Sequence, residues 1–390
     1  MAVIDGVLHH ELEFISSKKY RNGHLWEVKK KRAPQGCRRC GLVSDRRYGR
    51  VSVVVRERSS GEKPLWLKVH KHKYYCEACK KPFTELTPGT WLRRRSTQRF
   101  QKWIRKCCER YITLKSVAED NQCSQGFVYK AHYEQLEIRS RELKTKRWPT
   151  SLGIDEHFFT RRRGFPEYCT VFTDLNKRKL FEVAPTKSKK ALIAQLKHIP
   201  GRHRVRIVCI DLASGYRSLV KELFPNARIV SDKFHVLKLL MPEIMKQRQL
   251  VRSEHRKALS RKRLLANRNK LDYWVRSDMD SALRHYPELN ELYRAKEAIH
   301  TFYRAKGFKR GYQSFQKLIK RVEQSQQPKL KTLHKTLMRW RDEIISYFDF
   351  PVTNGVTEAI NGNAKALQRR ARGYRQFKNY RLALLNACAF

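Results

Sequence analysis

Val205-Arg-Ile-Val-Cys-Ile-Asp211 is the stretch of sequence that decides the fold of this chain. It is almost continuously apolar, as in a central strand that is covered on both faces of a sheet, and it ends in an acid. Residues 214–224, which follow it, have the pattern of a crossover helix, and residues 227–231 have that of another strand. The sequence therefore predicts a strand–helix–strand unit with parallel strands.

Further strands are predicted ahead of this stretch, and the first of them also ends in an acid. The expected strands span 151–155, 168–174 and 179–184, and an amphipathic helix spans 188–199. The resulting order, βββαβαβ, is the ribonuclease-H-like arrangement, in which the first and fourth strands lie side by side. We therefore expect Asp155 and Asp211 to meet at one edge of the sheet.

A third acid follows a long helical segment. Residues 233–350 are basic and helical, with few Gly or Pro residues inside the periodic segments, and they are predicted as an insertion. After them, residues 353–358 open a helix whose apolar side would pack on the sheet through Val356, Ala359, Ile360, Ala364 and Leu367. Glu358 shares the opposite side of this helix with Asn361 and Lys365, by i, i+3 and i+7 spacing.

Carboxylates that converge on one point repel one another, and bound divalent metal ions stabilise such a cluster. Asp155, Asp211 and Glu358 would hold two Mg²⁺ or Mn²⁺ ions roughly 4 Å apart for in-line phosphoryl transfer, without a covalent protein nucleophile. Each acid also has an ordinary alternative, as a solvated strand end or, for Glu358, as a complement to a helix dipole. The joint placement of Asp155 and Asp211 on neighbouring strands favours the metal site.

Cysteine pairs mark the N-terminal part of the chain. They are Cys37, Cys40, Cys76 and Cys79. Four thiolates can close a tetrahedral zinc site, and residues 51–56 and 65–75 alternate like the strands of a hairpin. We predict structural Zn²⁺ in a domain over 1–95, with a role in folding and DNA docking. The alternatives are reduced buried thiols, a redox pair, or His70 and His72 as substitute ligands.

Residues 96–147 have the spacing of a helix-turn-helix domain. A first helix begins after Thr97, and helices over 113–120 and 124–131 are separated by a short turn. The last of these would be the recognition helix, which enters the major groove of DNA. The side chains expected to face the groove are Ser124, Gln125, Tyr129 and Lys130.

The charge of the chain indicates a nucleic-acid partner. Lys and Arg number 86 against 36 Asp and Glu, which gives a net charge of +50 spread along the sequence. Nucleic acid fits such an excess, because each neutralised phosphate releases a condensed counterion. No apolar run approaches the ~18 residues of a spanning helix, and the first residues lack the form of a signal peptide. We expect a cytoplasmic, nucleoid-associated protein that binds double-stranded DNA and no membrane.

These motifs together resemble those of transposases of the insertion sequence L-three family over nearly the whole length. The cysteine pairs resemble its zinc finger, and residues 114–128 its helix-turn-helix. The motifs that resemble its DDE domain are Gly153-Ile-Asp155-Glu156, Asp211-Leu-x-x-x-Tyr216, Phe224-Pro-Asn-Ala227, Ser231-Asp232-x-Phe234-His235-Val236 and Asn354-Gly-x-x-Glu358-x-x-Asn361. The resemblance implies binding to terminal repeats, metal-dependent strand cleavage and strand transfer, and a catalytic triad of Asp155, Asp211 and Glu358.

Other residues are secondary candidates. Asp232 and His235 match the family, and a histidine three residues after an acid could assist a metal or a scissile phosphate. At a helix start they could equally form a cap and a packed imidazole. A phosphate-clamping surface is expected at Arg369, Arg370 and Arg372.

The predicted fold class is multidomain α+β. A zinc-binding β-hairpin domain (1–95) and a helix-turn-helix domain (96–147) precede a ribonuclease-H-like α/β catalytic domain, whose parts, 150–232 and 351–390, are interrupted by the helical insertion (233–350). Two other functions fit: a non-catalytic zinc-finger and helix-turn-helix regulator, or a structure-selective nuclease of the same fold. Because transposition coordinates two DNA ends, we expect at least a dimer on DNA.

Overall fold

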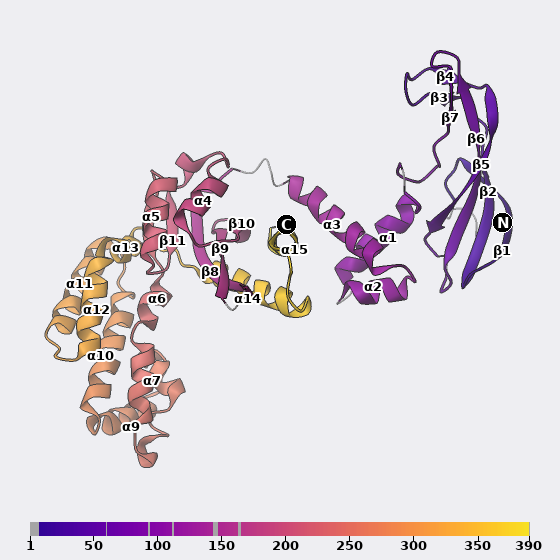
Figure 1. Ribbon diagram of the computed structural model, residues 1–390. Coiled ribbons are helices and arrows are strands. Elements are labelled where there is room, and N and C mark those ends of the chain that lie inside the picture. The colour runs from indigo at the N-terminus through magenta and orange to yellow at the C-terminus, as the bar shows by residue number, and fades with distance from the viewer. Residues whose placement is uncertain are drawn as a thin grey trace. The chain divides into compact units, whose positions relative to one another are not determined.

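The structure is a computed structural model that describes residues 8–59, 61–92, 94–110, 113–142, 147–162 and 165–389. The chain forms two compact units, Met1–Arg139 and Ser140–Phe390 (Figure 1). Both units contain helices and a β-sheet, so the mixed α+β class that we predicted is confirmed.

A mixed sheet forms the first part of unit Met1–Arg139. Its order is β1 (Leu12–Tyr20), β2 (Gly23–Lys30), β6 (Leu65–Cys76) and β5 (Arg47–Glu57), with β7 (Lys81–Thr84) also paired to β6. β5 and β6 are antiparallel and are the predicted hairpin. β1 and β2, which were not predicted, extend the sheet and bury Leu12 and Val28 in its core. A short ribbon, β3 (Gln35–Gly36) with β4 (Val43–Ser44), carries the first cysteine pair.

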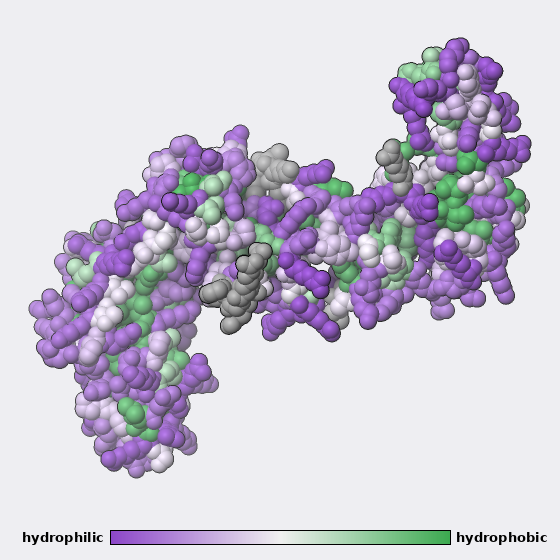
Figure 2. Space-filling model, viewed as in Figure 1, coloured by the Kyte–Doolittle hydropathy of each residue, from purple (hydrophilic) through white to green (hydrophobic). Residues whose placement is uncertain are grey.

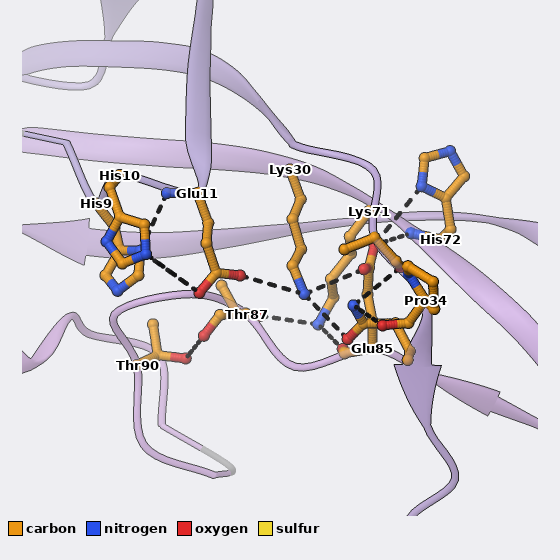
Figure 3. Close-up of polar contacts among 12 residues, drawn as sticks. His9, His10, Glu11, Lys30, Pro34, Lys71, His72, Glu85, Thr87 and Thr90 are labelled. Atoms are coloured by element: carbon orange, nitrogen blue, oxygen red, sulfur yellow. Dashed lines mark hydrogen bonds and ion pairs between the residues drawn. The ribbon is translucent and has the colours of Figure 1, made fainter. Parts of the chain in front are cut away.

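A buried ion network ties this sheet to the segment after β7 (Figure 3). Lys30 lies 3.2 Å from Glu85 and 3.6 Å from Glu11. The backbone N–H of His72 donates to the Glu85 carboxylate, and Lys71 Nζ donates to Thr87 Oγ1 at 2.8 Å. Because Glu85 and Lys30 are both buried, each charge compensates the desolvation of the other. Glu85 is therefore a structural residue.

Helices α1 (Gln98–Arg110), α2 (Leu114–Asp120) and α3 (Gln125–Glu142) follow. The hydroxyls of Thr97 and Thr113 accept hydrogen bonds from backbone N–H groups three residues on, which fixes the starts of α1 and α2. Val117, Ala118 and Val128 lie in the core between the helices, and the predicted helices are confirmed. α3 continues beyond the predicted recognition segment to Glu142.

The second unit is built on a sheet in the order β10-β9-β8-β11-β12. The strands are β8 (Ser151–Arg162), β9 (Phe165–Asp174), β10 (Lys179–Ala184), β11 (Ile207–Ile210) and β12 (Arg228–Ser231), with helices α4 (Lys189–Leu196) and α5 (Ser214–Leu223) between them. β8, β9 and β10 form an antiparallel meander, whereas β11 is parallel to both β8 and β12. The first and fourth strands are adjacent, as predicted.

The prediction that the first strand ends at Asp155 is wrong. β8 pairs with β11 only over Ser151–Gly153, but it continues alongside β9 as far as Arg162. The antiparallel partner supplies hydrogen bonds that the parallel partner no longer supplies, so the strand does not end where β11 does. Asp155 therefore lies within β8, beyond the end of its pairing with β11.

Helices of the insertion, shown in orange tones in Figure 1, confirm the predicted helical segment. They are α6 (Lys233–Lys238), α7 (Met241–Gln249), α8 (Arg261–Leu265), α9 (Tyr273–Arg284), α10 (Pro287–Phe302), α11 (Phe308–Glu323), α12 (Pro328–Arg339) and α13 (Arg341–Ile345). Their apolar residues share one continuous core with one face of the sheet and with α5. This core includes Leu152 of β8, Val208 of β11 and Leu219 of α5. The insertion is thus packed as part of its unit. Among the helices of the described residues, none has both the length and the apolar character needed to cross a membrane.

The other face of the sheet is covered by α14 (Gly355–Arg370) and α15 (Phe377–Cys388). Ile360 and Ala364 of α14 are buried with Val171 and Val183 of the sheet, as predicted. Ala359 was also expected in this contact, but it is exposed, because it lies about 100° around the helix from Ile360. α14 thereby brings the last predicted acid to the sheet.

Candidate active site and cysteine cluster

The acids from β8 and β11 interact in the second unit. Asp155 and Asp211 are both half-buried. Burial raises the pKa of Asp155 to about 6, and the charge of Asp211 acts in the same direction, followed by a smaller contribution from Glu358. The three predicted acids therefore lie close enough for their charges to interact, and a divalent cation would relieve their repulsion.

Both oxygens of the Asp155 carboxylate accept hydrogen bonds. Its Oδ1 accepts from the backbone N–H of Glu156, and its Oδ2 accepts from Nδ2 of Asn361, each at 2.8 Å. Asn361 is buried against the sheet, so the prediction that it shares with Glu358 and Lys365 the side of the helix opposite the sheet is wrong. The i+3 spacing turns Asn361 by about 60° from Glu358, which is enough to bring it to the sheet.

A buried cluster lies beside Asn361. His157 of β8 contacts the hydroxyl of Tyr380 in α15 and the thiol of Cys169 in β9. Burial lowers the pKa of His157 to about 4, although Asn361 beside it acts in the opposite direction. His157 is therefore a neutral core residue that joins β8 to α15.

Gly153 lets the start of α14 approach β8. Asn354 is fully buried, and its Nδ2 donates to the backbone carbonyl of Ile154 at 3.0 Å. A Cβ on Gly153 would lie 2.8 Å from Asn354 Oδ1 and closer still to Thr357 Oγ1. No side chain fits there unless α14 moves. The glycine two residues before Asp155 thus sets the position of the helix that carries Glu358.

We expect Gly153→Ala to destabilise the chain by about 1–3 kcal/mol, because the methyl group overpacks a buried contact. Gly362→Ala is the matched control on α14, because a methyl group there would have no atom within 4 Å. Alanine in a helix interior should stabilise it by roughly 0.5–1 kcal/mol. Urea denaturation followed by circular dichroism measures both. Equal stabilities of the two variants would show that the close approach of α14 to β8 is not constrained.

Asp211, Asp232 and His235 form a tighter group than the predicted triad. Their ligand atoms lie within 4.8 Å of one another, the only such group in the described part of the second unit. His235 Nδ1 lies 2.9 Å from Asp211 Oδ1 and 3.0 Å from Asp232 Oδ2. Burial lowers the pKa of His235, but the two carboxylates outweigh it and raise the pKa to about 10. Asp232 makes no side-chain cap on α6, so the alternative of a helix cap is wrong.

The donor set fits a divalent metal ion. Asp211 Oδ1 is buried and has no well-formed hydrogen bond among the described residues. His235, 2.9 Å from this oxygen, supplies one positive charge against the carboxylates of Asp155, Asp211 and Asp232, and a divalent cation would compensate the rest. Oxygen ligands from carboxylates are those that Mg²⁺ and Mn²⁺ prefer. Glu358 is more exposed, at the start of α14, and Lys238 Nζ donates to it at 3.1 Å.

The four cysteines of the first unit converge. Their sulfur atoms all lie within 4.8 Å of one another, with 3.9 Å between Cys37 and Cys79 and 3.5 Å between Cys40 and Cys76. Hydrogen bonds from the backbone N–H groups of residues 39 and 40 lower the pKa of Cys37 to about 6. This arrangement is compatible with a zinc site. His70 contacts Ser52 and Glu27, and His72 contacts Glu85, so neither is a substitute ligand here.

Comparison with known proteins assigns the chain to a family. Residues 152–384, more than half of the sequence, match the family model described as Transposase, which covers DDE transposases of the ISL3 (insertion sequence L-three) type. The chain belongs to the ISL3 transposase family. This transposase is also 25% identical, over 363 residues, to the transposase for insertion sequence element IS1001 of Bordetella parapertussis. That match covers 87% of this chain and 85% of the relative.

The predicted DNA-facing residues of the transposase are exposed. Those at the start of α3 are Ser124, Gln125, Tyr129 and Lys130, and those at the end of α14 are Arg369, Arg370 and Arg372. Ser124 Oγ also accepts from the backbone N–H of Phe127 at 3.2 Å, which fixes the start of α3. Exposure leaves these side chains available for DNA, and their contacts with DNA stay a prediction.

Proposed function

We propose that the transposase cuts and joins DNA strands with divalent metal ions held by Asp155, Asp211 and Glu358 in a ribonuclease-H-like catalytic domain. The observation that supports this most strongly is the half-buried pair of Asp155 and Asp211 on adjacent strands, where burial and then the charge of Asp211 raise the pKa of Asp155. Membership of a DDE transposase family implies the same use of metal. His235 supplies one compensating charge beside Asp211, and a divalent cation would compensate the negative charge that remains.

The protein's own groups prepare this site. Asn361 and the Glu156 backbone fix the orientation of Asp155, and His235 with Asp232 holds the position of Asp211. Bound there, Mg²⁺ or Mn²⁺ would polarise the scissile phosphate and activate the attacking oxygen. Asp232 and His235 stay secondary candidates, because they adjoin Asp211 directly and either could also reach a metal or a phosphate.

DNA recognition is proposed for the first unit. Zn²⁺ bound by the four cysteines would hold the end of the sheet in shape, and the start of α3 would read the terminal repeats of an insertion sequence. The arginines at the end of α14 would clamp phosphates. We expect cytoplasmic, nucleoid-associated protein and at least a dimer on DNA. A DNA complex whose measured mass contains a single subunit would contradict the dimer.

The test of the proposed function is the product formed from labelled terminal DNA with Mg²⁺ or Mn²⁺. A transposase yields cut ends and then products in which those ends are joined to target DNA. Cut ends that are never joined would favour a structure-selective nuclease. Specific binding without cutting, at any concentration of either metal, would favour a DNA-binding regulator. Sequencing of the junctions separates true strand transfer from recombination by other routes.

Asn361 offers a test of the positioning of Asp155. We expect Asn361→Ala to lower strand cleavage by about 10- to 100-fold, the usual effect of losing a group that orients a metal ligand. Most of the loss should appear as a higher Mg²⁺ concentration for half-maximal rate, because Asp155 is then free to rotate. Titration of the cleavage rate with Mg²⁺ measures this.

Asn363→Ala is the control for Asn361→Ala. Asn363 lies two residues further along α14 and is exposed, and its side chain donates to the Cys388 thiol at 3.8 Å. It should leave the Mg²⁺ dependence unchanged. If both variants titrate with Mg²⁺ as the wild type does, Asn361 packs against Asp155 without orienting it.

A further inference from the structure

The insertion contains a pocket that the proposed chemistry does not use. It lies between α9, α10 and α11 and has a volume of about 570 Å³. These helices lie together in the insertion in Figure 1, where the surface is largely hydrophilic (Figure 2). A pocket of this size holds a small ligand or a short piece of a larger one. Its lining is dominated by charged and polar side chains, so its ligand is polar.

The acids of the pocket are already neutralised. Arg268 forms a two-pronged ion pair with Asp280, one contact of which is 2.6 Å. Glu297 pairs with the buried Lys296 at 2.7 Å and accepts the backbone N–H of Arg268 at 3.2 Å. Both carboxylates are therefore satisfied by groups of the protein, and neither is left to balance another cation.

Four other cations of the lining have no such partner. They are Arg284, Arg294, Lys317 and Arg321. Within the described residues, none of their side chains makes a hydrogen bond or an ion pair. Like charges that face one volume repel one another, and the arrangement becomes favourable when an anion enters. The pocket therefore carries an uncompensated positive charge.

Tyr293 adds an unpartnered polar group to the same lining. Its side chain is 2% exposed, and its hydroxyl lies beside the Arg268 guanidinium without a well-formed hydrogen bond among the described residues. A buried hydroxyl of this kind is normally satisfied. Together with the free cations, it provides donors for an anionic ligand with several oxygen atoms.

We propose that this pocket binds phosphate groups of a DNA strand. Guanidinium groups match phosphate oxygens in pairs, and the free cations of α10 and α11 would contact successive phosphates. Tyr293 is the only aromatic residue among the described lining, and it is buried, so the pocket lacks the exposed ring on which a base would stack. The DNA source of the phosphates rests on the proposed function. A free nucleotide carries the same chemistry.

The test compares pairs of cations on one helix. Lys317→Ala/Arg321→Ala removes two pocket cations of α11, and Lys309→Ala/Arg310→Ala removes two exposed cations from the start of the same helix. DNA affinity of the full-length chain is measured by fluorescence anisotropy over a range of NaCl concentrations. Each lost phosphate contact should reduce the slope of log affinity against log salt by about 0.9. We expect a change of about 1.8 for the pocket pair and none for the control pair.

Two measurements, the salt dependence of DNA affinity and calorimetry with a nucleoside triphosphate, distinguish the outcomes. If the pocket pair alone lowers the slope, the pocket holds DNA phosphates. If the slope is unchanged but wild-type chain binds a nucleoside triphosphate in calorimetry and the pocket pair does not, the phosphate comes from a free nucleotide. Equal slope changes for both pairs, or no change in either arm, would overturn the proposal. The assay measures binding only, so a failure of strand cleavage leaves its result intact.

Discussion

Asp211→Asn is expected to lower the rates of strand cleavage and joining by about 10³-fold or more. Asparagine keeps the size of the side chain but removes the charge that would bind a catalytic metal, a contribution of several kcal/mol to the transition state. DNA affinity should stay within about twofold, because the residue lies at the sheet edge and outside the predicted recognition helix. Single-turnover cleavage of labelled terminal DNA measures the rate, and anisotropy measures the affinity.

The control is Asp174→Asn in the same sheet. Asp174 is buried at the end of β9, and its Oδ1 accepts from the backbone N–H groups of residues 176 and 177, each at 3.0 Å. Asparagine can accept the same hydrogen bonds, so its activity should match the wild type. The separate variants Asp155→Asn and Glu358→Gln should be inactive, as Asp211→Asn is. Retained cleavage in any of them would remove that residue from the triad.

The free energy of unfolding shows whether an inactive variant has lost a catalytic group or its folded structure. The pKa of Asp155 is raised, from 3.8 to about 6, so the folded state binds more protons than the unfolded state between these values. Its stability therefore falls as pH rises through that window. Asparagine at position 155 does not ionise, so Asp155→Asn should be at least as stable as the wild type at neutral pH. An inactive and destabilised Asp155→Asn would instead indicate a structural role.

Strands and helices of the second unit were predictable because the spacing of apolar residues within each segment is enough to indicate its secondary structure. The strands of the meander are joined by short turns, which makes them antiparallel neighbours. The strand before Asp211 is followed by a crossover helix, which makes the next strand parallel to it. The end of β8 was not predictable, because the pairing that extends it comes from β9. β1 and β2 were missed because their short apolar pattern becomes meaningful only once β6 is placed beside β2.

The acids of the candidate site could be predicted from the sequence, but the contacts that orient them could not. Asp155 and Asp211 were found from strand ends and strand order, which are properties of the sequence. The contact between Asn361 and Asp155 joins residues 206 positions apart, and no local pattern indicates it. The same is true of Asp232, whose burial depends on the packing of the insertion on the sheet. A glycine before Asp155 was the one local signal that α14 approaches closely.

Cys76→Ser is expected to release the zinc ion and unfold the end of the first unit that carries the cysteines. A structural zinc site contributes about 10–16 kcal/mol in small domains, as much as the whole folding stability of a typical domain, which is roughly 5–15 kcal/mol. The short ribbon of β3 and β4 has little core of its own to replace it. Metal analysis of the purified chain should give one zinc in the wild type and none in the variant.

Hydrogen exchange then locates the unfolding. Protection should be lost around residues 35–44 and 76–84, while the core of the sheet over Val28 and Val69 keeps part of its protection. Cys123→Ser is the control, because this half-buried thiol lies outside the cluster. Removal of zinc with a chelator should reproduce the variant. If Cys76→Ser retains both its zinc and the protection of this segment, the four sulfur atoms are not a zinc site that holds this end of the sheet in place.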